Sequence, residues 1–362
     1  MKTISKLRAC SPSRPLFYLI TPITALALIV AASVYSFPRL SIEHGDACKS
    51  CHINPNGGGA RTEYANFSVA FNELCLPQTK KLVASHYKKP RLGESVIIGF
   101  DSRHLLLDNG SVFNMQTDAF VTVQPLKNLS YHMRFSPSYG ISENYALLYL
   151  YDQKYYIKAG HFYPAFGLRN EDHTAYDRTK TGNTPTLYLD GLSLGAELFG
   201  VNFAAELLDQ SGQGAYGLHA YRAGSLSSLG YLVGASWRLP EDVSGSRPPF
   251  PHAKALFGGL SYDRFTAMGE YDAIGSDGHE RAAYANLTTR LEYGCYLVAE
   301  YNFYNPNRLT SDSTREFRRF SLELYPLPFV QLRPSYTVYS DAVDNKLTGK
   351  KNQFFLQMHF GY

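Results

Sequence analysis

The sequence predicts an all-β protein, an antiparallel transmembrane β-barrel of about sixteen strands over residues 93–362, preceded by a small, mainly α-helical segment. Three observations predict this fold. The chain is rich in tyrosine (28), phenylalanine (22) and glycine (29). From residue 93 onward, strand-length segments alternate apolar with polar residues, and Gly, Asn, Asp, Pro and Ser separate them. No long apolar run or convincing amphipathic helix interrupts this pattern.

The first residues have the layout of an export signal. Basic side chains precede an apolar run, residues 16–32, which ends in small residues. We therefore expect a signal peptide over 1–36, with cleavage before Phe37. The alternative is an uncleaved anchor, because the run is nearly long enough to span a bilayer. The exported chain keeps Cys75 and Cys295, which either form a disulfide or stay as two buried thiols.

Residues 47–61, ACKSCHINPNGGGAR, contain the strongest motif of the sequence, Cys-x-x-Cys-His at Cys48, Cys51 and His52. Two thiols about one helical turn apart can each form a thioether with a porphyrin vinyl group, and the adjacent imidazole can bind the iron. We therefore expect one covalent haem c, with His52 as an iron ligand. A thioredoxin-like redox pair lacks its strand–helix–strand surroundings here, and a zinc site lacks a second ligand pair.

The residues after the motif suggest room for a flat macrocycle. Pro55 and Gly57–Gly59 cannot continue a helix, and three glycines allow the backbone to approach a ligand closely; an ordinary turn is the alternative. Arg61 is a candidate partner for a haem propionate, or else a solvated side chain.

A helix is predicted over residues 62–76, with Thr62 as its N-cap and Pro77 as its stop. Its apolar positions at helical spacing are Tyr64, Phe67, Phe71 and Leu74. This face would either cover the porphyrin edge or dock on the rest of the protein.

The second axial ligand of the iron is less defined. Methionine is absent between Phe37 and the first predicted strand, so the local candidates are His86, which we prefer, and His44. A bis-histidine iron would have a lower reduction potential than a histidine–methionine iron. If neither histidine binds, the open position would invite small ligands.

The last predicted strand shows the alternation most clearly. In FFLQMHFGY, Phe354, Leu356, Met358, Phe360 and Tyr362 share one face, and Phe355, Gln357, His359 and Gly361 share the other. Arg319, Ser321 and Glu323 alternate with Phe320, Leu322 and Leu324 in the same way. A soluble β-sandwich also alternates. Aromatic residues on the apolar faces and arginine and glutamate on the polar faces favour a barrel with lipid outside and a polar lumen.

One predicted connection is unusually long and charged. The segment LRNEDHTAYDRTKTGNTPT, residues 168–186, either folds into the lumen or lies outside in solvent. In the first case it would line the narrowest point with Arg169, Glu171, Asp172, His173, Asp177 and Arg178. A metal site from Glu171, Asp172 and His173 is a weaker alternative.

The signal peptide, the single Cys-x-x-Cys-His and a barrel that ends in an aromatic residue resemble the fused monohaem c-type cytochrome–porins of bacterial outer membranes, whose best-known members oxidise ferrous iron. Phe37-Pro38-Arg39 resembles the aromatic–Ala/Pro–Arg approach of that family. The CHINPNGGGAR continuation departs from it and resembles a wider group of exported monohaem proteins. The resemblance implies a cytochrome c-like domain over 37–92 and a porin-like barrel over 93–362 in the outer membrane.

The expected function is one-electron exchange between an extracellular donor or acceptor, such as Fe(II), and a periplasmic carrier such as a cytochrome. This leaves open whether the protein is an enzyme. The haem segment would either hang beneath the lipid-embedded barrel in the periplasm or enter the barrel as a plug. Residues 37–92 are too few for a comfortable core, which favours the plug. The main alternative is a solute- or ion-conducting porin with a haem-containing plug, and a third is haem chemistry on a small ligand such as peroxide. No nucleic-acid-binding motif is present, and nucleic acid is not an expected partner.

Overall fold

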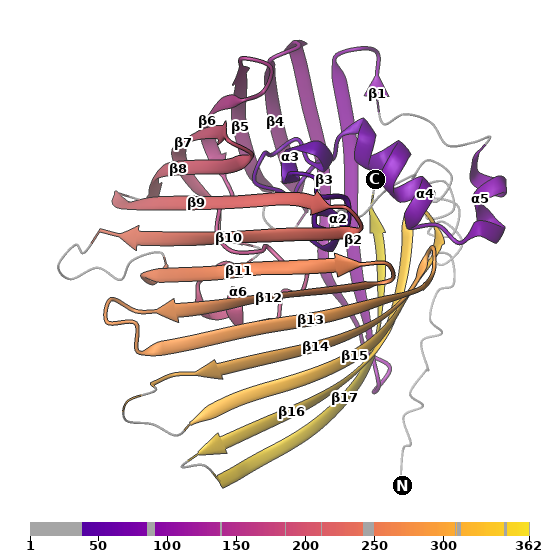
Figure 1. Ribbon diagram of the computed structural model, residues 1–362, viewed down its shortest axis with the longest axis vertical. Coiled ribbons are helices and arrows are strands. Elements are labelled where there is room, and N and C mark those ends of the chain that lie inside the picture. Colours follow the sequence, from indigo (N-terminus) through magenta and orange to yellow (C-terminus); the bar gives the residue numbers. More distant parts are fainter. Residues whose placement is uncertain are drawn as a thin grey trace, which may run out of the picture. The chain divides into compact units, whose positions relative to one another are not determined.

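One antiparallel sheet that closes on itself dominates the computed structural model (Figure 1). The structure describes residues 38–84, 91–137, 140–184, 186–210, 212–241, 250–307, 309, 313–343 and 346–361. The expected signal peptide and His86 lie outside these ranges. All the described residues belong to one unit, Ala32–Tyr362.

The strands follow one another around the barrel in sequence order. Strands β2–β9 are Val96–Leu107, Val112–Leu126, Leu129–Ser136, Gly140–Leu150, Tyr155–Phe162, Leu189–Leu198, Val201–Gln210 and Gln213–Leu226. Strands β10–β17 are Leu229–Pro240, Ala253–Tyr262, Phe265–Ile274, Glu280–Glu292, Cys295–Asn305, Thr314–Leu327, Val330–Val343 and Lys346–Gly361. A short strand, β1 (Arg91–Leu92), pairs with the start of β2.

The barrel is closed by its last and first long strands. β17 pairs with β2, with Phe355 opposite Leu107 and Gly361 opposite Asp101. Within the described residues, β2–β17 thus form a closed ring of sixteen strands, each antiparallel to its neighbours. Closure removes the unpaired strand edges that lipid does not tolerate. The predicted fold class and the strand count are confirmed.

The two faces of the wall differ in polarity as predicted. In β15, Phe320 is 58% exposed on the outside, whereas Arg319 is only 4% exposed on the inside. In β17, Gln357 and His359 are buried in the lumen, and Phe354 is exposed. The outward apolar faces can therefore meet lipid while the inward polar faces bind one another and the segments within the bore.

The two ends of the barrel have different connections. Turns such as 199–200, 227–228 and 293–294 are short, and β2 begins and β17 ends at this same end. The longest described connection, residues 163–188 between β6 and β7, leaves from the opposite end and contains the helix α6 (Tyr176–Lys180). None of the helices in the described part of the chain is long and apolar enough to cross a membrane.

The N-terminal segment, residues 38–84, is a chain of short helices. These are α2 (Pro38–His44), α3 (Cys48–Cys51), the π-helix η1 (Ala65–Ala70), α4 (Phe71–Glu73) and α5 (Pro77–Ala84). Leu40 and Leu74 are buried together with Tyr296 and Tyr325 of the wall, so the barrel completes the apolar core that the segment lacks by itself.

The contacts of this segment place it in the short-turn end of the bore. Gly45 lies against Gly224 at the end of β9, and Gly230 at the start of β10 lies against the backbone of Ile42. On another side of the lumen, Leu76 N donates a 3.1 Å hydrogen bond to Tyr325 O. The segment is therefore enclosed by strands from several parts of the ring.

The helix predicted over residues 62–76 is partly wrong. Thr62 does cap it, since Thr62 Oγ1 accepts a 3.3 Å hydrogen bond from Ala65 N. The middle of the predicted helix is π-helical, with a wider turn than an α-helix, and Tyr64 just before it is 42% exposed instead of sharing a buried face. Pro77 is the first residue of α5, because a helix needs no N–H donor in its first turn.

Candidate cofactor site

The Cys-x-x-Cys-His motif lies on α3 and the residue that follows it. His52 leaves the helix with extended backbone, φ −119° and ψ 147°. The chain then returns, because Ile53 N donates to Ala60 O (2.9 Å) and Thr62 N donates to Cys51 O (3.0 Å). The motif and the glycines are thus two sides of one small closed loop.

The glycines of this loop make close backbone approaches. Gly57, Gly58 and Gly59 have φ of +83°, +72° and +68°, a region that other residues rarely adopt. A Cβ at Gly57 would lie 3.8 Å from Cys48 Sγ, and a Cβ at Gly58 would lie 2.4 Å from Arg169 Cζ. The glycines therefore pack closely against the motif and against the long loop from β6, and their approach to a macrocycle stays a prediction.

This long loop, residues 163–188, folds into the lumen, and the inward alternative of the sequence analysis is confirmed. Its backbone N–H groups are hydrogen-bonded by wall side chains: Ala165 N donates to Glu206 Oε2 (2.9 Å), Gly167 N to Ser236 Oγ (3.0 Å) and Tyr176 N to Asn302 Oδ1 (3.2 Å). We call it the inward loop.

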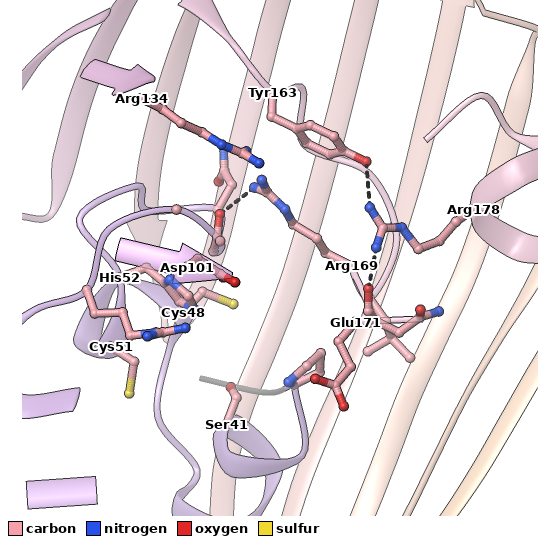
Figure 2. A pocket seen from close by; sticks show the side chains of 18 of the residues that line it. Ser41, Cys48, Cys51, His52, Asp101, Arg134, Tyr163, Arg169, Glu171 and Arg178 are labelled. Carbon is pink, nitrogen blue, oxygen red and sulfur yellow. Dashed lines mark hydrogen bonds between the residues drawn. The ribbon is translucent and has the colours of Figure 1, made fainter. Parts of the chain in front are cut away.

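The motif and the inward loop border one cavity (Figure 2). Cys48, Cys51 and His52 line it from the N-terminal segment, and Arg169 and Tyr163 line it from the inward loop. It contains about 1000 Å³ of space free of protein atoms, its open mouth included.

Arginine dominates the charge of the cavity wall. The arginines that line it are Arg61, Arg103, Arg134, Arg169 and Arg178, and the acidic residues are Asp46, Asp101 and Glu171. Arg103 Nη1 donates to Glu171 O (3.1 Å), and Arg178 Nη2 donates to Tyr163 OH (3.2 Å). The excess of positive charge suits a ligand that carries carboxylates.

The residues around the motif fit a covalently held porphyrin better than a zinc ion. Burial raises the pKa of the Cys48 thiol, although Tyr221 and Arg169 oppose the shift. This shift disfavours the thiolate form that zinc binds. Phe120, Leu168 and Tyr188 add apolar wall to the cavity. Among the described residues, no three His, Cys, Asp or Glu side chains lie together so that they could hold a metal ion, which counts against the alternative site at Glu171, Asp172 and His173 as well.

Of the histidines that could bind the iron opposite His52, His44 does not line the cavity. His44 Nε2 lies 2.9 Å from Glu73 Oε2, and this hydrogen bond raises the pKa of His44. It therefore joins α2 to α4 instead of lining the cavity. His86 lies outside the described residues. His173 of the inward loop does line the cavity. Burial lowers its pKa well below the usual range, and Arg178 and Arg103 lower it further, which keeps the imidazole neutral.

Only some of the six ionisable residues that were predicted to line the narrowest point do line the cavity. Arg169, Glu171, His173 and Arg178 line the cavity. Asp172 instead pairs with Arg319 of the wall, and Asp177 accepts a hydrogen bond from Asn170 within the loop.

Among the cavity residues that the sequence did not reveal are two arginines. Arg103 of β2 and Arg134 of β4 are inward positions of strands that alternate in polarity. A charged residue at a period-two position was the available signal, but the sequence does not say which wall positions lie beside the motif. Cys75 and Cys295 are both thiols in the structure, without a disulfide between them.

The fold is that of the outer-membrane porins. OmpT of Vibrio cholerae, expressed in the outer membrane, is similar with a TM-score of 0.56 and 9% identity over 76% of this chain and 100% of that one. OmpF of Salmonella typhi, in complex with daunomycin, is similar with a TM-score of 0.53 and 13% identity over 75% of this chain and 98% of that one. OprB of Pseudomonas putida is similar with a TM-score of 0.52 and 6% identity over 78% of this chain and 96% of that one. No family model matches the chain, and no curated protein matches it.

Proposed function

We propose that this porin-fold protein carries a covalent haem c inside its barrel and exchanges single electrons between an extracellular donor, such as Fe(II), and a periplasmic carrier such as a cytochrome. One observation supports it above all: Cys48, Cys51 and His52 line a cavity within the bore. When bound, the haem supplies one-electron redox chemistry.

The orientation of bacterial outer-membrane barrels supports the proposed direction of access. Such barrels have their short turns in the periplasm and their longer loops outside the cell. The N-terminal segment occupies the short-turn end, so the motif would be reached from the periplasm. The inward loop would border the path from the outer mouth.

Each part of the site would have a separate task. Cys48 and Cys51 would tether the macrocycle, and His52 would bind its iron. Gly57–Gly59 would leave room beside it, and Arg61 is one of several arginines that would hold its carboxylates. The surrounding wall would exclude bulk water from the site.

A second candidate is a solute- or ion-conducting porin, in which the N-terminal segment is a haem-containing plug. The likeness to OmpF and OprB favours this alternative, because it concerns the whole barrel. The occupied bore counts against it, since both the N-terminal segment and the inward loop would narrow any path.

Expression in a host that matures c-type cytochromes, followed by purification in detergent, tests the proposal. We expect a pyridine haemochrome band and covalent haem on a denaturing gel, and reduction of the haem by anaerobic Fe(II). Cys48→Ala/Cys51→Ala should lose both haem signals, whereas Cys75→Ala should keep them. A wild-type protein without the band would overturn the proposal, and steady conductance of that protein in planar bilayers would support the porin instead.

A further inference from the structure

The cavity holds a second imidazole besides that of the motif. Among the described residues that line it, His52 and His173 are the histidines, and neither methionine nor lysine is present. Tyr163 and Tyr188 also line it, but Tyr163 OH donates to Asn183 O (2.6 Å) and Tyr188 OH accepts a hydrogen bond from Arg134. Within the described residues no hydrogen bond or ion pair engages the ring of His173.

The backbone on both sides of His173 is fixed to the barrel wall. Before it, Glu171 pairs with Arg333 of β16 (3.0 Å), and Glu171 O accepts from Arg103 of β2 (3.1 Å). After it, Thr174 Oγ1 accepts a 3.1 Å hydrogen bond from Arg319 of β15.

Asp172 completes this clamp. It pairs with Arg319 and accepts hydrogen bonds from Thr174 N (2.9 Å) and Thr174 Oγ1 (2.7 Å). The neighbours of His173 are therefore all committed to the wall, while its own side chain reaches the cavity without a partner. Such contacts hold a metal-binding side chain in position before the metal binds.

We propose that His173 is the second axial ligand of the iron whose first ligand is His52, an inference that rests on the proposed haem. Neutral imidazole is a common iron ligand in haem proteins. The two ligands would then come from the two segments that fill the bore, one from the N-terminal segment and one from the inward loop. Haem attachment would join these segments, and neither His86 nor His44 would be required.

Spectroscopy of the purified ferric protein tests the proposal. The variants are His173→Ala, His173→Met and His86→Ala, with His279→Ala as a control in the 275–279 loop, away from the cavity. Each variant is checked for haem by the pyridine haemochrome and for barrel folding by heat-modifiable migration on a gel. Electron paramagnetic resonance and visible spectra then report the spin state, and a redox titration reports the potential.

We expect the wild type, His86→Ala and His279→Ala to be six-coordinate and low-spin with two imidazole ligands. His173→Ala should lose the low-spin signal, gain a high-spin one and regain the first on addition of free imidazole. His173→Met should stay low-spin with a raised potential, because a thioether favours the reduced iron. A haem-loaded His173→Ala protein with the wild-type spectrum, or loss of the low-spin signal in His86→Ala, would overturn the ligand assignment alone. A wild type without haemochrome would overturn it together with the proposed function.

Discussion

The two segments that fill the bore are held in different ways. The N-terminal segment depends on apolar packing, with Leu40 and Leu74 buried against wall tyrosines, and on the buried ion pair between Arg39 and Glu323 of the wall. At Glu171 and Asp172 the inward loop is instead held by charge, through the wall arginines Arg333 and Arg319. The segment that carries the cysteines thus shares an apolar core with the wall, whereas this part of the loop is bound to wall arginines.

This difference assigns separate roles to the two segments. The inward loop continues into β6 and β7 at its two ends, so its buried ion pairs fix a position that covalent geometry already restricts. The N-terminal segment joins the wall on one side, where α5 ends at Ala84 and β1 begins at Arg91. It must therefore be kept in the bore by its contacts. Four predictions test this contrast, from the largest expected effect to the smallest.

Removal of residues 38–84 should have the largest effect. The barrel closes through β17 and β2 without this segment, so the shortened chain should still fold and show heat-modifiable migration on a gel. Its single-channel conductance in planar bilayers should rise from little or none to that of an open pore. If conductance stays at the wild-type level, the inward loop alone closes the bore, and the segment is not the plug.

Arg39→Ala should loosen the segment strongly. Arg39 Nη1 lies 2.7 Å from Glu323 Oε2, and both side chains are buried, so the change leaves a buried carboxylate with one partner fewer. Loss of one member of such a pair destabilises by about 3 kcal/mol or more. The measurement is the urea concentration at which protease cleaves the segment in detergent.

Lys49→Ala is the matched control for this change. Lys49 pairs with Glu197, and both side chains are partly exposed, so we expect a loss of at most about 1 kcal/mol. Equal shifts of the two cleavage midpoints would show that burial of the Arg39 pair contributes nothing to the position of the segment.

Gly58→Ala should disturb the contact between the two segments. A left-handed conformation disfavours alanine by about 1–2 kcal/mol, and the new methyl group would also displace the guanidinium of Arg169. Gly110→Ala has similar backbone, φ +79°, with nothing within 4 Å of the added Cβ, so it measures the backbone effect alone. The thermal midpoint of protease cleavage should fall further for Gly58→Ala, and equal falls would mean that Arg169 adjusts freely.

Much of the wall follows from local rules, which is why the sequence predicts it. The alternation around Arg319 and Gln357 specifies the inward face of each strand, since a shift by one residue would turn arginine towards lipid. The Cys48–His52 motif is equally local, because its spacing is set by one helical turn. These features require no knowledge of distant residues.

The composition of the cavity depends instead on which segments meet. Arg134 and His173 are far apart in sequence and line the same cavity because the inward loop crosses the lumen. The π-helix of η1 was missed for a related reason. Its buried residues Val69 and Ala70 pack in one cluster with Tyr296 and Tyr325 of the wall. Helix propensity is a property of the local sequence and carries no information about these wall contacts.

The smallest expected effect concerns the internal link between α2 and α4. The hydrogen bond to Glu73 raises the pKa of His44 in the folded protein. Folding thus favours protonated His44, and the hydrogen bond contributes to the free energy of unfolding. This contribution is complete below the unfolded pKa of about 6.5 and is lost as pH rises through the higher folded pKa. Since His44 and Glu73 are partly exposed, their interaction should contribute no more than about 1 kcal/mol to the free energy of unfolding. Protease cleavage midpoints of the segment should therefore fall with rising pH in the wild type by more than in His44→Gln, whereas His279→Gln should follow the wild type. Parallel pH profiles for wild type and His44→Gln would show that the hydrogen bond between His44 and Glu73 contributes nothing to holding α2 against α4.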